Sequence, residues 1–288
     1  MATIISGKEL AALRKKKMAE EVLKYISIYG RAPHLAVILV GEDPGSVSYV
    51  KGKEKACGEV GIQNTTLRLP DTITEEELLN YVKEYNEDSN VDGILVQLPL
   101  PKHICSDKII KAIRYDKDVD GFHPMNVAAL YSKQEGIVSC TPKGIIELID
   151  SISYPIEGKN ACVIGRSNIV GLPVSKLLLD RNATVTITHS RTKNLESVTS
   201  LADILIVAIG KPLFVKASMV KEHALVIDVG VNRNPVTNKL CGDVDFNEVV
   251  DKVDYITKVP GGVGPMTICC LMENTIECYL KRMEAKND

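Results

Sequence analysis

The chain has 288 residues, of which 45% are hydrophobic and 25% are charged, and its formal net charge at pH 7 is -2. These proportions are typical of a globular protein with room for two domains, and the balanced charge gives no electrostatic reason to expect nucleic acid or an anionic membrane as a partner. No apolar run approaches the roughly 20 residues of a membrane helix, and the mixed charges near the N-terminus are unlike a signal peptide. We therefore expect a cytoplasmic protein.

Eight cysteines are scattered along the chain without a Cys-x-x-Cys pair. Most of them lie in apolar runs such as ACVIG and TICCLM. This pattern predicts buried, reduced thiols rather than disulfides or ligands of a metal, and we expect no metal site.

Apolar runs that favour strands alternate with helical patterns in the first half of the chain. After an amphipathic helix at the N-terminus, the predicted strands are 34–41, 64–70 and 93–99, and the predicted helices are 46–61, 74–86 and 106–113. Thr141 followed by Pro142 is typical of a helix start, which predicts a further helix over 140–152.

The second half repeats this alternation, with predicted strands at 160–165, 183–190, 203–210, 224–230 and 255–262 and a long final helix. Near-continuous runs of Val, Ile and Leu between helices indicate parallel sheets that are covered on both faces. We predict an α/β fold with two three-layer domains, over 1–140 and 141–265, and expect the final helix, 266–288, to pack back on the first domain.

The segment GRSNIVGLP, residues 165–173, joins a predicted strand to a predicted helix. Gly165 ends the strand and Gly171 lies at the helix start, while the residues between them offer backbone N–H groups, a hydroxyl and a guanidinium. A helix N-terminus with such donors is a natural phosphate site. The usual G-x-G-x-x-G spacing is missing, so a simple strand-to-helix turn is the alternative.

The next predicted strand ends in THSRTKN, which contains His189, Ser190, Arg191 and Lys193 but no carboxylate. A unit that binds NAD places an acid about 20 residues beyond the glycine turn, whereas NADP needs positive charge and donors there. Arg166, Ser190 and Arg191 could all hydrogen-bond a 2′-phosphate, which favours NADP. A solvated basic loop is the alternative.

A lysine falls on the apolar face of the helix predicted to start at Asp43-Pro44. At about 100° per residue one face carries Val50, Ala56, Cys57 and Val60. Lys53 projects into its middle, flanked by Ser46 and Tyr49. A low dielectric disfavours the ammonium and lets such a lysine exchange protons near neutral pH. The alternative is an amine that reaches solvent and a tyrosine that fills the core.

Polar groups also follow predicted strands elsewhere. GILVQLPLP places Gln97 at the end of an apolar run, and KDVDGFHP places Asp118 and Asp120 in a tight turn. Ligands of parallel sheets bind at the carboxyl ends of the strands. Each feature also has a structural explanation when it is considered alone. Gln97 could be a hydrogen-bonded amide in the core, and the two aspartates could be turn formers. The glycines of KVPGGVGPMT, 258–267, could simply form a connecting loop.

Taken together, the chain resembles the bifunctional methylenetetrahydrofolate dehydrogenase/cyclohydrolase family, in the motifs VQLPLP, KDVDGFHP, SCTPKG, GRSNIVGLP, VIDVGVNR, CGDVDF and VPGGVGPMT. The resemblance implies an N-terminal folate-binding catalytic domain, a Rossmann-like NADP domain, a cleft between them and a homodimer. It also implies that NADP+ oxidises 5,10-methylenetetrahydrofolate to the 5,10-methenyl form, which water then opens to 10-formyltetrahydrofolate.

The resemblance assigns roles residue by residue. Lys53 would handle the proton of the hydrolysis, Gln97 would position it, Tyr49 would bound the folate ring, and Asp120 would grip the amino-pyrimidine edge of the pterin. The other implied substrate residues are Ser46, Val96, Leu98, Pro99, Gly261, Gly262 and Pro265. The implied NADP residues are Gly165, Arg166, Ser167, Ile169, His189, Ser190, Arg191, Ala208, Gly210, Val231 and Thr267.

The sequence departs from the family pattern at VAAL (127–130), Ser139, Thr188 and Lys258. None of these positions is a matched catalytic residue, but Lys258 puts the local cofactor contacts in question. Two alternatives stay open: an enzyme with only one of the two activities, and a non-catalytic NADP-binding redox sensor whose cysteines carry the signal.

Overall fold

The structure is a computed structural model that describes residues 2–285. It divides into two compact units. The three-stranded unit comprises Leu13–Cys140 and the chain from Ile268 onward, and the six-stranded unit comprises the chain up to Ala12 together with Thr141–Thr267. The division falls within helices α1 (Gly7–Tyr29) and α10 (Val263–Glu284).

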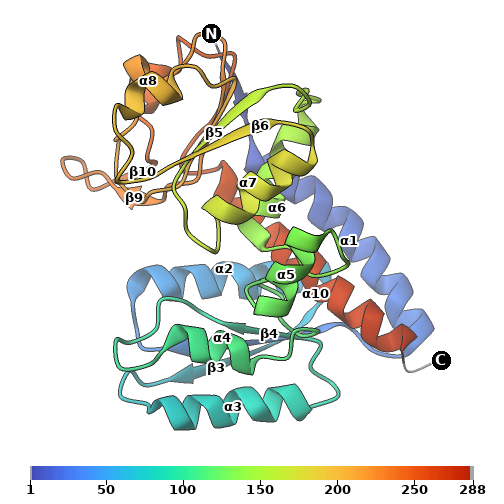
Figure 1. Cartoon of the computed structure of the whole chain (residues 1–288). Coiled ribbons are helices and arrows are strands. Elements are labelled where there is room, and N and C mark those ends of the chain that lie inside the picture. The colour runs from blue at the N-terminus through green and yellow to red at the C-terminus, as the bar shows by residue number, and fades with distance from the viewer. Residues whose placement is uncertain (1, 286–288) are drawn as a thin grey trace. The chain divides into compact units, whose positions relative to one another are not determined.

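The three-stranded unit contains a parallel sheet in the order β3-β2-β4. Its strands are β2 (His34–Val40), β3 (Gln63–Leu69) and β4 (Gly93–Val96), and its helices include α2 (Pro44–Val60), α3 (Glu75–Glu87), α4 (Ser106–Ala112) and α5 (Pro124–Ser132). Every residue of β2 is buried, as expected of a central parallel strand. Figure 1 shows α2 on one face of this sheet and α3 on the other.

Local signals explain where α2 and α3 begin. Asp43 caps α2 by accepting a hydrogen bond from the Ser46 N–H at 2.8 Å, and Pro44 occupies the first turn, as predicted. Thr74 and Glu77 form a capping box at the start of α3. Each arrangement satisfies N–H groups that a helix start otherwise leaves without a partner.

The six-stranded unit contains a parallel sheet in the order β1-β11-β8-β7-β5-β6. Its strands are β1 (Thr3–Ile5), β5 (Asn160–Ile164), β6 (Thr184–Thr188), β7 (Ile204–Val207), β8 (Leu225–Asp228) and β11 (Tyr255–Thr257). The strand order reverses direction between β5 and β7, which is where such sheets bind ligands. Other elements are α6 (Cys140–Ser151), α7 (Gly171–Asp180), α8 (Leu195–Thr199), η1 (Ala217–Met219), α9 (Phe246–Val249) and the hairpin β9 (Asn232–Arg233)–β10 (Leu240–Cys241).

The structure has a strand at each position where the apolar runs predict one, but several strands end early. The strand predicted over 255–262 stops at Thr257, since Pro260 and the glycines after it cannot continue a ladder. The predicted first domain, 1–140, includes residues 3–5, whereas β1 pairs with β11 in the six-stranded unit. A three-residue strand that pairs with a segment so distant in sequence leaves no local signal.

One helix start differs from the prediction. Helix α6 begins at Cys140, as predicted, with Thr141 inside its first turn. Helix α10 begins at Val263, three residues before the predicted start at residue 266, so Thr267 lies within the helix. The hydroxyls of Thr141 and Thr267 hydrogen-bond each other at 3.0 Å instead of capping either helix. Within residues 2–285, every helix is too short or too polar to span a membrane.

Candidate active site

Lys53 lies in the middle of the buried face of α2. The buried residues of this helix are Ser46, Val50, Lys53, Ala56, Cys57 and Val60, in agreement with the predicted face. Only 7% of Lys53 is exposed. An ammonium group therefore lies among aliphatic side chains, where its charge is disfavoured unless a polar group contacts it.

Gln97 supplies that contact. Lys53 Nζ donates a hydrogen bond to Gln97 Oε1 at 2.8 Å, and Gln97 Nε2 donates to the Leu98 carbonyl at 2.6 Å. The second bond turns the amide oxygen toward the amine. The backbone N–H of Gln97 donates to the Ile38 carbonyl at 2.9 Å, so the Gln97 side chain extends from the carboxyl end of β4. Two residues that the sequence singled out separately are thus in direct contact.

The carboxylate of Asp120 influences the pKa of the Lys53 amine. Burial lowers the pKa of Lys53 below its ordinary value, and the charges of Asp120, Cys140 and Cys57 oppose this shift. Burial likewise raises the pKa of Asp120 to about 6, with Lys53 opposing the shift and Asp118 adding to it. The two groups thus bind protons with more similar affinities than a surface lysine and aspartate, which suits proton exchange.

Tyr49 and Ser46 precede Lys53 on the same helix. Tyr49 is half-buried, and burial raises the pKa of its phenol, so the ring stays neutral at physiological pH. Ser46 is buried. The predicted substrate residues next to Gln97 differ in exposure: Val96 is buried in β4, Leu98 is half-buried and Pro99 is exposed. All of these residues, with Asp120, belong to the three-stranded unit.

The segment that carries Asp120 is anchored by a lysine that sequence reasoning missed. Lys117 is fully buried, and its ammonium donates to three backbone carbonyls at 2.7–2.8 Å, those of Tyr85, Asn86 and Asp88. These carbonyls end α3, where the helix dipole favours a cation. Burial nevertheless lowers the pKa of Lys117 to about 8.

Asp118 and Asn274 hold the same segment from two other sides. Asp118 is a turn former, since its carboxylate accepts hydrogen bonds within 2.9 Å from the backbone of His123 and the amide of Asn126. Asn274, in α10, donates at 2.9 Å to two carbonyls, those of Val119 and Val138. A buried asparagine in a helix carries no local signal of such a distant partner. Asp120 is therefore presented by a rigid loop.

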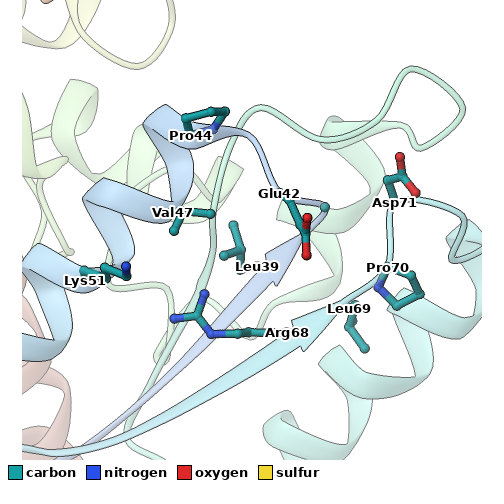
Figure 2. A pocket seen from close by; sticks show the side chains of 10 residues that line it. Leu39, Glu42, Pro44, Val47, Lys51, Arg68, Leu69, Pro70 and Asp71 are labelled. Atoms are coloured by element: carbon teal, nitrogen blue, oxygen red, sulfur yellow. The ribbon is translucent and has the colours of Figure 1, made fainter.

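A cavity of about 820 Å³ lies at the carboxyl ends of β2 and β3. Figure 2 shows Lys51 and Arg68 on one side of it and Glu42 and Asp71 on the other. Its lining residues are Leu39, Gly41, Glu42, Pro44, Val47, Lys51, Arg68, Leu69, Pro70 and Asp71, which include no predicted site residue. Lys51 is about 200° around α2 from Lys53, so this cavity is separate from the Lys53–Gln97 contact.

The glycine turn of the six-stranded unit requires both of its glycines. Gly165 has φ +124°, and a Cβ there would lie 2.3 Å from the Ala208 carbonyl oxygen. A Cβ on Gly171 would lie 2.3 Å from the Gly165 carbonyl oxygen. Ser167 Oγ accepts hydrogen bonds from the N–H groups of Val170 and Gly171 at 3.2 and 3.3 Å, which satisfies two donors at the start of α7. The backbone thus folds tightly before the helix, as a phosphate-binding turn needs.

The basic segment after β6 lies beside this turn. The Gly165 N–H donates to the Thr188 carbonyl at 2.9 Å, which joins the carboxyl ends of β5 and β6. Arg166, Ser190 and Arg191 are exposed, and His189 Nδ1 accepts from the Arg191 N–H at 3.2 Å. The donors that the sequence predicts for a 2′-phosphate therefore extend from adjacent strand ends.

Of the other predicted cofactor residues, Ala208 and Gly210 follow β7, Val231 follows β8, and Ile169 lies in the turn after β5. The Ala208 N–H donates to the Ile164 carbonyl at 2.9 Å. Gly210 is exposed with φ +64°, and Ile169 and Val231 are 39% and 48% exposed. Both side chains are therefore accessible to a ligand.

The PGGVGPMT segment lies at the end of β11. Gly261 has φ +108°, and a Cβ on Gly262 would lie 2.9 Å from the Lys258 carbonyl oxygen. Pro265 is half-buried in the first turn of α10. Gly261, Gly262 and Pro265 belong to the six-stranded unit, whereas Lys53 belongs to the other.

Two of the positions that depart from the family pattern, Thr188 and Lys258, have ordinary surroundings, whereas Ser139 does not. Thr188 is buried, and its hydroxyl donates to the Val163 carbonyl at 3.3 Å. The Lys258 ammonium lies 5.4 Å from the centre of the Phe246 ring, a cation–π contact. Ser139 is buried, and its hydroxyl has no hydrogen-bond partner among the described residues.

Comparison with known proteins covers almost the whole chain. Residues 5–120 match the tetrahydrofolate dehydrogenase/cyclohydrolase catalytic domain, and residues 139–283 match the NAD(P)-binding domain of the same family. The bifunctional protein FolD of Bacillus cytotoxicus is 55% identical over 277 residues, which are 96% of each chain. FolD of Listeria innocua is also 55% identical, over 96% of this chain and 97% of that one.

Solved structures agree with these matches. A bifunctional FolD methylenetetrahydrofolate dehydrogenase/cyclohydrolase from Campylobacter jejuni is 47% identical with a TM-score of 0.95, over 98% of this chain and 100% of that one. A methylenetetrahydrofolate dehydrogenase-cyclohydrolase from Trypanosoma brucei, in complex with NADP and an inhibitor, is 37% identical with a TM-score of 0.94, over 97% and 98% of the two chains.

Proposed function

Because the chain belongs to the tetrahydrofolate dehydrogenase/cyclohydrolase family, we propose that it catalyses two successive steps of one-carbon metabolism. It oxidises 5,10-methylenetetrahydrofolate to the 5,10-methenyl form with NADP+, and it hydrolyses the methenyl form to 10-formyltetrahydrofolate. The observation that carries this proposal is the contact of 2.8 Å between Lys53 Nζ and Gln97 Oε1 on the buried face of α2.

Lys53 moves the proton of the hydrolysis. Water adds to the methenyl carbon, and its oxygen then loses both protons: one is transferred to N5 as the bond from that carbon to N5 breaks, and the other is released to solvent as the formyl C=O forms. The neutral amine of Lys53 accepts the proton from water, and the ammonium that forms can return it to N5. Gln97 holds the amine through its amide oxygen, and burial keeps a larger fraction of the amine neutral than on a surface lysine.

Asp120 and Tyr49 bind and orient the folate. The carboxylate of Asp120 can accept hydrogen bonds from the amino-pyrimidine edge of the pterin, and Tyr49 offers a neutral ring against which a planar ligand can stack. The hydride acceptor is supplied by NADP+ when it is bound, and the protein then needs mainly to align the two reactants. Lys53 is therefore needed far more for hydrolysis than for hydride transfer.

The choice of NADP+ over NAD+ follows from the segment after β6. A 2′-phosphate needs positive charge and donors, and Arg166, Ser190 and Arg191 extend there without a carboxylate in THSRTKN. In such units the pyrophosphate lies beside the glycine turn between strand and helix, which here is the tight turn at Gly165–Gly171. These features fit NADP, and the relative from Trypanosoma brucei is a complex with NADP.

We further propose that the three-stranded unit is the folate-binding catalytic domain and the six-stranded unit the NADP domain. We also propose, from the family resemblance, that the protein is a cytoplasmic homodimer.

An absorbance assay tests the proposed function directly. The protein is given 5,10-methylenetetrahydrofolate with NADP+ or, separately, with NAD+, and the appearance and decay of the methenyl product are followed in one trace. We expect both phases with NADP+ and slower formation with NAD+. Formation without decay would indicate a dehydrogenase alone, and the lack of both phases would contradict the proposal.

The redox-sensor alternative makes a separate prediction about the eight cysteines. Cys57, Cys140, Cys162, Cys269, Cys270 and Cys278 are buried, Cys241 is half-buried and Cys105 is exposed. Burial raises the pKa of Cys57 to about 12 and that of Cys162 to about 11, which suppresses the reactive thiolate. We expect a thiol reagent to modify Cys105 quickly in the native protein and all eight cysteines only after denaturation. Rapid native modification of several buried thiols would favour the sensor.

A further inference from the structure

Two buried aspartates lie in the six-stranded unit, outside the Lys53 site. Asp228 is the last residue of β8 and is 3% exposed, and Asp243 follows the hairpin β9–β10 and is 0% exposed. A buried carboxylate is costly unless hydrogen bonds or opposite charges compensate it. The partners of these two side chains therefore indicate what they hold in place.

Asp243 is surrounded by hydrogen-bond donors. Its Oδ2 accepts from the N–H groups of Ile209 and Gly210 at 2.7 and 3.0 Å. Its Oδ1 accepts from the Lys211 N–H at 2.7 Å and from Asn232 Nδ2 at 2.8 Å. Three of these donors are consecutive backbone groups of the loop after β7, and the fourth is the residue after Val231. One side chain thus gathers the loops that follow β7 and β8.

Asp228 holds Asp243 in turn. Its carboxylate accepts hydrogen bonds from three backbone N–H groups at 2.9–3.0 Å, those of Gly230, Asp243 and Val244. Burial raises the pKa of Asp228 to about 7 against these three bonds, and Asp243 adds to the rise. The arrangement is mutual: the Asp243 carboxylate accepts from the side chain of Asn232 in the segment after β8, while Asp228, at the end of β8, accepts from the backbone N–H of Asp243.

Two glycines make room for this mutual arrangement. A Cβ on Gly242 would lie 1.8 Å from Asp228 Oδ2, and a Cβ on Gly230 would lie 2.3 Å from Asp243 Oδ1. Each aspartate therefore occupies the space that a side chain would take on the other segment. The segments VIDVG (226–230) and CGDVD (241–245) are thereby held against each other by hydrogen bonds and close packing.

We propose that Asp243 is a positioning residue for the dinucleotide site, which fixes the loops carrying Ala208, Gly210 and Val231 so that they can bind NADP+. This proposal rests on the proposed function. A loop whose backbone contacts a ligand cannot be ordered by burial of its own side chains. Here a single carboxylate, which accepts hydrogen bonds from three successive N–H groups, orders the loop instead. An asparagine of the same size would turn an NH2 group toward these donors and leave some of them unpaired.

The test is isothermal titration calorimetry with NADP+ on the full-length protein and on Asp243→Asn, since the chain has no tryptophan to report binding by fluorescence. We expect the Kd for NADP+ to rise at least about tenfold, which corresponds to about 1.4 kcal/mol. The cyclohydrolase rate, measured on methenyltetrahydrofolate without nucleotide, is expected to fall by less than about twofold. This split distinguishes positioning from general destabilisation.

Asp245→Asn is the matched control. Asp245 lies two residues further along the chain and pairs with Lys216 at 2.7 Å, so its substitution removes the same charge but leaves the loops after β7 and β8 untouched. We expect a Kd for NADP+ within about twofold of the unsubstituted protein. Asn232→Ala removes only one of the four donors to Asp243, and we expect a rise of about threefold even if Asp243→Asn does not fold.

Three results would contradict the proposal. A folded Asp243→Asn protein with an unchanged Kd would show that the carboxylate does not position the site. Equal losses of NADP+ affinity and of cyclohydrolase activity would indicate a purely structural role. Failure of the unsubstituted protein to bind NADP+ would overturn the proposed function and this proposal with it, whereas the first two results leave the proposed function intact.

Discussion

Lys53→Met is expected to reduce the cyclohydrolase rate by about 10²- to 10⁴-fold, the contribution of a well-placed proton-transfer group. Methionine keeps most of the buried apolar volume of the lysine but removes the amine that contacts Gln97 at 2.8 Å. Dehydrogenase activity with NADP+ should keep a substantial part of its value, because hydride transfer depends on alignment rather than on this amine. Both rates are read from the methenyl absorbance.

Lys51→Met is the matched control for this substitution. Lys51 is two residues earlier on α2 but exposed, and it lines the separate cavity of Figure 2. We expect both activities within about twofold of the unsubstituted protein, as is usual for a surface position. If Lys53→Met and Lys53→Gln both hydrolyse methenyltetrahydrofolate at the original rate, Lys53 is not the proton-transfer group.

The double substitution Arg191→Asp with Ser190→Ala is expected to raise the Kd for NADP+ by about 10²-fold, because it removes two donors and places a negative charge against the 2′-phosphate. The Kd for NAD+, which lacks this phosphate, should change by less than about threefold. Titration of the protein with each nucleotide separates the two effects. Both side chains are exposed, so we expect the doubly substituted protein to fold normally.

Lys159→Asp gives the control for the charge change. Lys159 immediately precedes the amino end of β5, whereas Gly165 follows the carboxyl end of the same strand. Lys159 therefore lies away from the carboxyl edge of the sheet. We expect nearly equal affinities for NADP+ in this variant and in the unsubstituted protein. An equal loss of NADP+ and NAD+ binding in the Arg191→Asp, Ser190→Ala protein would contradict the assignment of the 2′-phosphate to this segment.

Much of the fold is predictable because the signals are local. A parallel strand that is buried on both faces must be largely apolar, and residues 35–40 and 204–209 are apolar without interruption. The position of Lys53 follows in the same way, since helical geometry alone puts it on the face of Val50 and Cys57. Its burial and its partner Gln97 in the structure agree with that geometry.

What could not be predicted depends on contacts between residues far apart in sequence. Strand β1 has only three residues, and its partner β11 lies some 250 residues later. Asn274 and Asp243 are polar residues whose partners are backbone groups of distant loops. A polar residue of this kind looks the same in sequence whether it faces water or anchors a loop, so neither residue could be assigned before the structure.

The central claim is that the buried amine of Lys53 loses its proton more readily than an ordinary lysine. The direct measurement is an NMR titration of protein labelled with 13C at the lysine Cε, in which the Lys53 signal is assigned as the one missing from Lys53→Met. The structure predicts a pKa below the ordinary 10.5 for this residue. A pKa of 10.5 or higher would contradict the claim.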